Sequence, residues 1–185
     1  MEVKGMRRLI TLLALAFTLA LVPAIPAQAK KPLVGTMDLE FNLDWPGPQQ
    51  TDIPDWVGNI TIDSTEYGMA FFAIGSGKEF EAVPGKVHFF EEIWRIYDWV
   101  TFNFTTQVLD YGEILLWGYD VGQTCLNGKN YNYHMNGNVE VAVGGFAVWE
   151  GRNVHMSGEI EWQEIETPEG PALAPHYAPG TFRIN

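Results

Sequence analysis

The sequence predicts an all-β protein: a single antiparallel β-barrel of about eight strands that follows an N-terminal signal peptide. After residue 30, apolar and polar residues alternate with a period of two in one segment after another, while helical periodicity is almost absent. Clusters of Gly, Pro, Asn and Asp separate these segments, as they do between the strands of hairpins. Strands in this number close into a barrel, and a β-sandwich is the alternative.

Residues 1–29 have the three parts of a secretory signal peptide. A basic pair of arginines precedes the apolar run 9–22, and a small-x-small triplet ends at Ala29. The apolar run is shorter than the ~20 residues that span a bilayer comfortably, which favours a removed signal over an anchor. We therefore expect export to the medium or the cell envelope, and one β-barrel domain over 30–185 with no membrane span after cleavage.

The charge of the chain disfavours anionic partners. The formal net charge is −12 over 185 residues, and the expected leader contains more basic than acidic residues, so its removal makes the protein more acidic still. Such a surface repels phosphate backbones and anionic lipid headgroups. We expect no nucleic-acid partner, whereas a small-molecule ligand and assembly into a homo-oligomer both stay open.

Cysteine and histidine usage indicates neither a disulfide nor a metal site. Cys125 is the only cysteine, so an intrachain disulfide is excluded and the fold must be stable by packing alone. A Cys-based zinc site needs several thiolates, and the four histidines show no His-x-x-x-His spacing. We expect no metal and no cofactor.

The first expected strand, at 34–45, alternates most regularly. Its apolar face consists of Met37, Leu39, Phe41, Leu43 and Trp45. The opposite face is polar, so the strand is expected to be half-buried in an antiparallel sheet. Further strands are expected at 56–63, 66–75, 85–97, 100–109, 112–122 and 124–144, with 180–185 as a closing strand.

Turns and loops are expected between these strands. Asn127-Gly128 and Asn136-Gly137 are the strongest signals for type I′ turns, because both central positions of such a turn need positive φ. The Pro-rich stretches 46–56 and 167–180 are expected to be long loops, since each proline removes a donor from a β-ladder. Long loops on a rigid β-scaffold often carry functional sites.

Residues 144–162 are expected to form one hairpin with a turn at 150–153. In its second strand, Met156, Gly158, Ile160 and Trp162 share one face. His155, Glu159 and Glu161 share the other face, which alternation turns toward water. Glycosidase-type chemistry needs a carboxylic acid in an apolar pocket, and nothing here supplies one. We interpret these charged residues as a solvated face.

Glu92 is the candidate catalytic residue. It lies in the segment 85–97, where both strand faces carry bulky apolar groups, and its own face also holds Phe90 and Trp94. A carboxyl group buried among such neighbours is expected to have a raised pKa, which suits proton transfer. A glutamate at the barrel rim, paired with an arginine, is the alternative interpretation.

Aromatic residues on strands are the candidate ligand-binding residues. Trp117 and Tyr119 share a face that would suit a ligand-holding lumen, in which polar tips orient the guest. The ligand-binding candidates are Trp94, Trp117, Tyr119 and Trp149. A core filled by these side chains is the alternative, because small barrels are usually filled.

The segment 117–162 resembles the later strands of the allene oxide cyclase and dirigent barrel superfamily. The resemblance depends on a Gly-rich segment that matches at Gly137, Val139, Ala142, Gly145 and Phe146. It implies an eight-stranded antiparallel barrel with an apolar cavity, and it assigns no catalytic residue. A lipocalin-like barrel is the rival, although no Gly-x-Trp signature stands near the expected mature N-terminus.

Three functions follow from these observations, and whether the protein is an enzyme stays open. The first is a secreted binding protein that holds a small apolar or aromatic ligand in the barrel mouth. The second is a cyclase or isomerase built around a buried carboxylate such as Glu92. The third is a structural protein of the cell envelope.

Overall fold

A computed structural model describes residues 31–44, 53–74, 87–127, 130–168 and 170–185. The leader expected at 1–29 lies wholly outside these residues, and the turn expected at Asn127-Gly128 lies partly outside them. Trp45 and most of the loop expected at 46–56 lie outside them as well.

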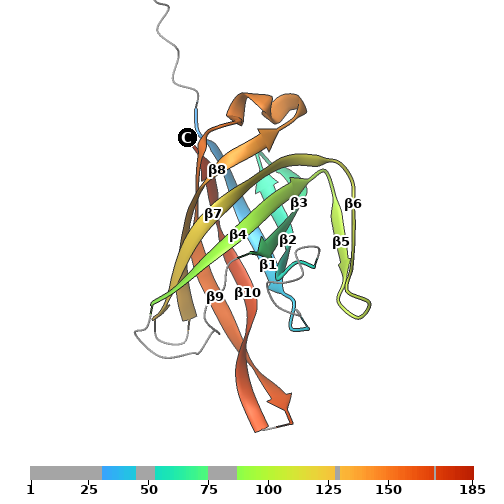
Figure 1. The fold of residues 1–185 in the computed structure, drawn as a ribbon, viewed down its shortest axis with the longest axis vertical. Coiled ribbons are helices and arrows are strands. Elements are labelled where there is room, and N and C mark those ends of the chain that lie inside the picture. Colours follow the sequence, from blue (N-terminus) through green and yellow to red (C-terminus); the bar gives the residue numbers. More distant parts are fainter. Residues whose placement is uncertain (1–30, 45–52, 75–86, 128–129, 169) are drawn as a thin grey trace, which may run out of the picture. The chain divides into compact units, whose positions relative to one another are not determined.

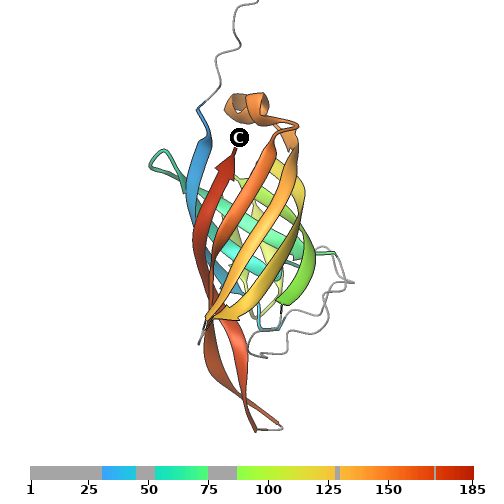
Figure 2. The ribbon, with the colours of Figure 1, turned by 90° about the vertical axis from the view of Figure 1, so that its left-hand side faces the viewer.

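The protein is an all-β barrel, as the alternation predicts. Eight strands close it in the order β1-β10-β9-β8-β7-β4-β3-β2, and every neighbouring pair is antiparallel (Figures 1 and 2). The β-sandwich alternative is therefore wrong. The barrel strands are β1 (Leu33–Phe41), β2 (Trp56–Ile62), β3 (Thr65–Ala73), β4 (Val87–Tyr97), β7 (Ile114–Asn127), β8 (Asn130–Ala142), β9 (Asn153–Thr167) and β10 (Gly170–Ile184).

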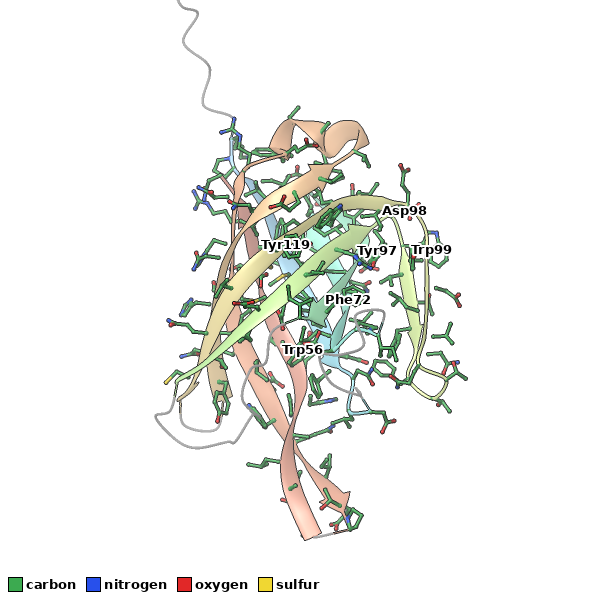
Figure 3. All side chains as sticks on the ribbon, in the orientation of Figure 1. Trp56, Phe72, Tyr97, Asp98, Trp99 and Tyr119 are labelled. Atoms are coloured by element: carbon green, nitrogen blue, oxygen red, sulfur yellow. The ribbon has the colours of Figure 1, made fainter. Side chains whose placement is uncertain are left out.

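A separate hairpin covers part of the outside of the barrel. β5 (Val100–Asn103) pairs only with β6 (Val108–Tyr111), so the single strand expected at 100–109 is wrong. Gln107, at the end of the connecting turn, has a φ of 56°. The hairpin covers a small apolar core on the outer faces of β2, β3 and β4, where Figure 3 shows Phe72 and Tyr97. The buried members of this core are Val57, Ala70, Phe72 and Tyr97.

The alternation expected in the first strand holds only as far as Phe41. Met37 and Leu39 are buried as expected, but the strand ends at Phe41, after which Asn42 is buried and Leu43 is exposed. Asn42 is buried because hydrogen bonds hold it against Gln107 of the β5–β6 hairpin and against the residues before β2. Its backbone N–H donates to the carbonyl of Asp55 at 2.8 Å, and its side-chain amide donates to the carbonyl of Pro54 at 3.1 Å.

Two expected features of β8 and of the segment that follows it are wrong. Residues Gly144–Trp149 form a short 3-10 helix, η1, in place of the first strand of the expected hairpin. Asn136 and Gly137 lie inside β8 and form no turn there. Gly137 is required in the strand because a Cβ atom at this position would collide with the backbone carbonyl of Tyr119 on β7. The second strand expected from 144–162 is confirmed as part of β9, with Met156 and Ile160 buried.

The Pro-rich stretch 167–180 is mostly strand rather than loop. Pro171 and Pro175 lie in the part of β10 that pairs only with β9, since the pairing of β10 with β1 reaches no further than Tyr177. On such an edge a missing N–H breaks no ladder hydrogen bond. This part of β9 and β10 projects beyond the barrel as a two-stranded ribbon (Figure 1).

The interior of the barrel is filled over most of its length. Trp94 of β4 is fully buried, and its ring meets that of Phe182 of β10 edge to face at a centroid distance of 5.6 Å. Met37, Ile60 and Met156 are among the other fully buried side chains of this core. In the described part of the chain, no helix has the length and hydropathy needed to cross a bilayer.

Candidate functional site

Three acidic side chains are buried together in the barrel. The exposed fractions of Asp55, Glu92 and Asp120 are 4%, 5% and 3%. Glu92 on β4 is the cross-strand partner of Asp120 on β7 and of Ala73, the last residue of β3. Asp55 directly precedes β2, and its side chain is hydrogen-bonded to that of Glu92. We call these three residues the carboxyl cluster.

Backbone hydrogen bonds hold Asp55 in place. Its N–H donates to the carbonyl of Phe71 on β3 at 3.1 Å, and its own carbonyl accepts from the N–H of Asn42 at 2.8 Å. The residue is thus fixed between the end of β1 and the end of β3. The carboxyl cluster therefore lies toward the end of the barrel at which β1 and β3 end and β2 begins.

The alternation of β4 places Glu92 in the interior. Trp94 is buried on the same face, whereas Glu91 is exposed on the opposite face. The expected burial of Glu92 on a face with Phe90 and Trp94 is therefore confirmed, although Asp55 and Asp120 also surround it. Its catalytic role stays a prediction.

Asp120 belongs to the face of β7 that the sequence analysis did not place inside. Leu116, Gly118, Asp120, Gly122 and Thr124 are buried. Gly118 and Gly122 leave room for rings from β4: a Cβ atom at Gly118 would lie 2.7 Å from the Trp94 ring, and one at Gly122 would overlap the Phe90 ring. The alternating glycines were the signal that this face of β7 points inward.

Burial raises the pKa of all three carboxyl groups, because the ionised form loses its hydration. The pKa of Asp55 rises from 3.8 to about 6, although the hydrogen bond from Glu92 and nearby backbone amides lower it in part. Burial raises the pKa of Glu92 well above its ordinary value, and the charges of Asp55 and Asp120 add to this. The pKa of Asp120 is raised by burial and then by the charge of Asp55. The three carboxyl groups therefore keep their protons to a higher pH than exposed carboxyl groups do.

Several polar atoms at the carboxyl cluster have no hydrogen-bond partner in the described part of the chain. They are Oδ1 of Asp55 and both carboxyl oxygens of Asp120. Nε1 of Trp94, two residues from Glu92 on the same face, also has none. An unpaired buried polar group destabilises a fold by about 1–3 kcal/mol, so these atoms need a partner that this part of the chain does not supply.

Tyr133 of β8 is a further polar group in this interior. Its hydroxyl packs against Gly158 and Gly180 and lies 3.4 Å from the carbonyl oxygen of Pro179. Burial raises the pKa of Tyr133, and the negative charge of Glu92 contributes to the increase. The phenol therefore stays protonated at neutral pH.

The four aromatic candidates lie in three different places. Trp94 is in the interior beside Glu92, and Trp149 packs at the other end of the barrel, in η1 between the end of β8 and the start of β9. Trp117 and Tyr119 lie on the outer face of β7, with ring centroids 5.5 Å apart and Tyr119 44% exposed (Figure 3). The expectation that Trp117 and Tyr119 line the lumen is wrong, because the glycine-bearing face of β7 points inward.

Metal binding finds no support in the described residues, which contain no group of three or more His, Cys, Asp or Glu side chains arranged to hold an ion.

No protein-family model matches the chain, and neither does any curated protein or solved structure with which it was compared. The resemblance to allene oxide cyclase and dirigent barrels thus stays a prediction.

Proposed function

We propose that this protein binds a small molecule inside its barrel, at the carboxyl cluster and beside Trp94. The observation that carries the proposal is that buried oxygens on Asp55 and Asp120 find no hydrogen-bond partner among the described residues. A ligand that donates hydrogen bonds to these oxygens would replace the hydration that they lose on folding. The neighbouring rings of Trp94 and Phe90 would contact its apolar or aromatic part.

Stability alone does not account for the carboxyl cluster. Most of the other described side chains in the interior are apolar, and apolar residues at the positions of Asp55, Glu92 and Asp120 would avoid the loss of hydration altogether. Departures from a consistently apolar core are expected at functional sites. Three acidic residues at one place in a largely apolar interior therefore favour a binding role.

Native mass spectrometry tests this proposal. Protein purified gently from its own host should carry a noncovalent mass that is released when the protein unfolds. Asp120→Leu, which removes both unpartnered oxygens, should lose that mass, while Asp110→Leu, at an exposed position on β6, should keep it. A wild-type protein with only its apo mass would contradict the proposal.

Proton-transfer catalysis is a second candidate function. Asp55, with a pKa raised to about 6, and Glu92, with a pKa raised well above its ordinary value, form a hydrogen-bonded pair. A pair of carboxyl groups that shares a proton can supply a base and an acid, which is what general acid–base catalysis requires. Incubation of the released ligand with wild-type protein should then give a product, and Glu92→Gln should abolish turnover while it retains the ligand. Equal turnover by both proteins would contradict this role.

The site of action that we propose is outside the cytoplasm. The proposal depends on the leader pattern at 1–29 and on the acidity of the remaining chain. N-terminal sequencing of the protein from its host should find Lys30 as the first residue. A first residue at Met1 or Met6 would contradict export by cleavage at this place.

A further inference from the structure

We infer that the ligand of the carboxyl cluster is a small organic cation, an ammonium or guanidinium group on an apolar or aromatic body. This inference rests on the binding function proposed above and specifies the chemistry of the ligand. Four features of the described residues lead to it: uncompensated negative charge, unpartnered acceptor oxygens, aromatic walls, and the lack of a metal-binding arrangement.

The first feature is that no basic side chain of the described residues compensates the carboxyl cluster. The groups that act on the three carboxyls are one another and backbone amides. Arg95 belongs to the same strand as Glu92, but its guanidinium lies over the Phe72 ring, 4.4 Å from the ring centroid, in the core outside the barrel. A buried carboxylate without a positive partner is unfavourable, so a bound cation would stabilise it strongly.

The second feature is the number and kind of free acceptors. Oδ1 of Asp55 and both oxygens of Asp120 are buried and have no partner within the ranges that the structure describes. An ammonium group has three donors and no acceptor, and a guanidinium group has five donors, so either could satisfy several of these oxygens at once. A neutral alcohol, with one donor, would leave most of them unpaired.

The third feature is the aromatic surroundings of the cluster. Trp94, fully buried, and Phe90 flank Glu92 along β4, and both rings pack over glycines of β7. The face of an indole ring attracts a cation, and the attraction is larger when water is excluded. The same rings offer apolar contact to the body of the ligand.

The fourth feature separates an organic cation from a metal ion. Within the described ranges, the three carboxyls do not form an arrangement that could hold a metal. A cation that binds through directed N–H donors does not need the close convergence of oxygens that a metal ion needs.

Isothermal titration calorimetry with three probes of similar size tests the inference. The probes are benzylammonium, benzyl alcohol and benzoate, at neutral pH and with the full chain after removal of any bound molecule. We expect benzylammonium to bind at least about tenfold more tightly than benzyl alcohol, and benzoate to show no binding. Asp55→Asn and Asp120→Asn should each weaken benzylammonium binding by about tenfold or more, whereas Asp110→Asn should leave it unchanged. Circular dichroism confirms that each variant is folded.

The possible outcomes distinguish this inference from the proposed function. If benzyl alcohol binds as tightly as benzylammonium, the cation inference is overturned and the binding function stands. The cation inference also falls if the two cluster variants bind benzylammonium as well as the wild type does, since the probe then binds elsewhere. If no probe binds but the host protein carries a noncovalent mass, only the cation inference is overturned. If no probe binds and no mass is carried, both are overturned.

Discussion

The barrel interior has two parts: in one, apolar side chains pack against one another, and in the other, buried polar groups lack hydrogen-bond partners among the described residues. Around Trp94 and Phe182, large apolar side chains fill the space, and on β7 glycines accommodate the rings. Around Glu92 and Asp120, carboxyl groups are buried next to one another, with oxygens that lack partners in the described residues. The first part accounts for stability, whereas the second lowers stability and is the place to look for function.

The largest expected effect comes from truncating the filled part. Trp94→Ala removes a fully buried indole and should lower the free energy of unfolding by about 3–5 kcal/mol. Trp99→Ala, at a position that is 50% exposed, is the matched control and should have a much smaller effect. Urea unfolding followed by circular dichroism measures both. Equal effects at the two positions would show that the interior is not filled as described.

The pH dependence of stability probes the carboxyl cluster. The folded state binds protons more tightly than the unfolded state, because burial raises the pKa values of Asp55, Glu92 and Asp120. The contribution of these groups to the free energy of unfolding is therefore present at low pH and is lost as the pH rises through their pKa values in the folded state. For Asp55 the shift from 3.8 to about 6 corresponds to about 3 kcal/mol. The three groups titrate together, so the loss belongs to the cluster.

A comparison with an amide variant isolates this loss. The triple variant Asp55→Asn, Glu92→Gln, Asp120→Asn should gain about 3 kcal/mol or more relative to the wild type as the pH rises from about 4 through the folded pKa values of the three groups. Glu91→Gln, at the exposed neighbour of Glu92, should follow the wild-type profile. Urea unfolding at several pH values measures the difference. Parallel profiles for the triple variant and the wild type would contradict the raised pKa values.

A smaller effect is expected where the β5–β6 hairpin meets the end of β1. The side-chain amides of Asn42 and Gln107 form a reciprocal pair, with N···O distances of 2.6 and 3.1 Å. Asn42→Ala should lower the free energy of unfolding by about 1–3 kcal/mol, because it leaves the buried carbonyl of Pro54 without this donor. Gln107→Ala should have less effect, since this residue is only half-buried. A larger effect for Gln107→Ala would be inconsistent with the described burial.

The smallest effect is expected on the outer face of β7. Tyr119→Ala should change the free energy of unfolding by no more than about 0.5–1 kcal/mol and should leave the mass carried by the host protein unchanged, because Tyr119 is 44% exposed outside the barrel. Thermal unfolding and native mass spectrometry check the two statements. Loss of the bound mass in this variant would move the binding site to the outer face.

The fold could be predicted from the sequence because alternation reports directly on which strand face is buried. The same logic found Glu92, since two bulky apolar neighbours on its face required an interior position. It failed on β7, where Trp117 and Tyr119 are more hydrophobic than the inward residues Gly118, Asp120 and Gly122. On that strand, space for the rings of β4 decided the orientation, and such space is a property of the neighbouring strand.

The rest of the site could not be read from local patterns. Asp55 precedes β2 in a Pro-rich stretch, and only hydrogen bonds to residues far along the chain place it beside Glu92. Pro171 and Pro175 of β10 misled for a similar reason, because their effect depends on whether a neighbouring strand needs their N–H. Both features depend on long-range pairing rather than on the neighbours in the sequence.

A crystal structure of the protein purified gently from its own host tests the central claim most directly. We expect non-protein electron density larger than a water molecule within hydrogen-bond distance of the Asp120 carboxyl oxygens, beside the Trp94 ring. Density for water alone, or a protein side chain paired with the Asp55 and Asp120 oxygens, would show that the carboxyl cluster is satisfied without a ligand and would contradict the account.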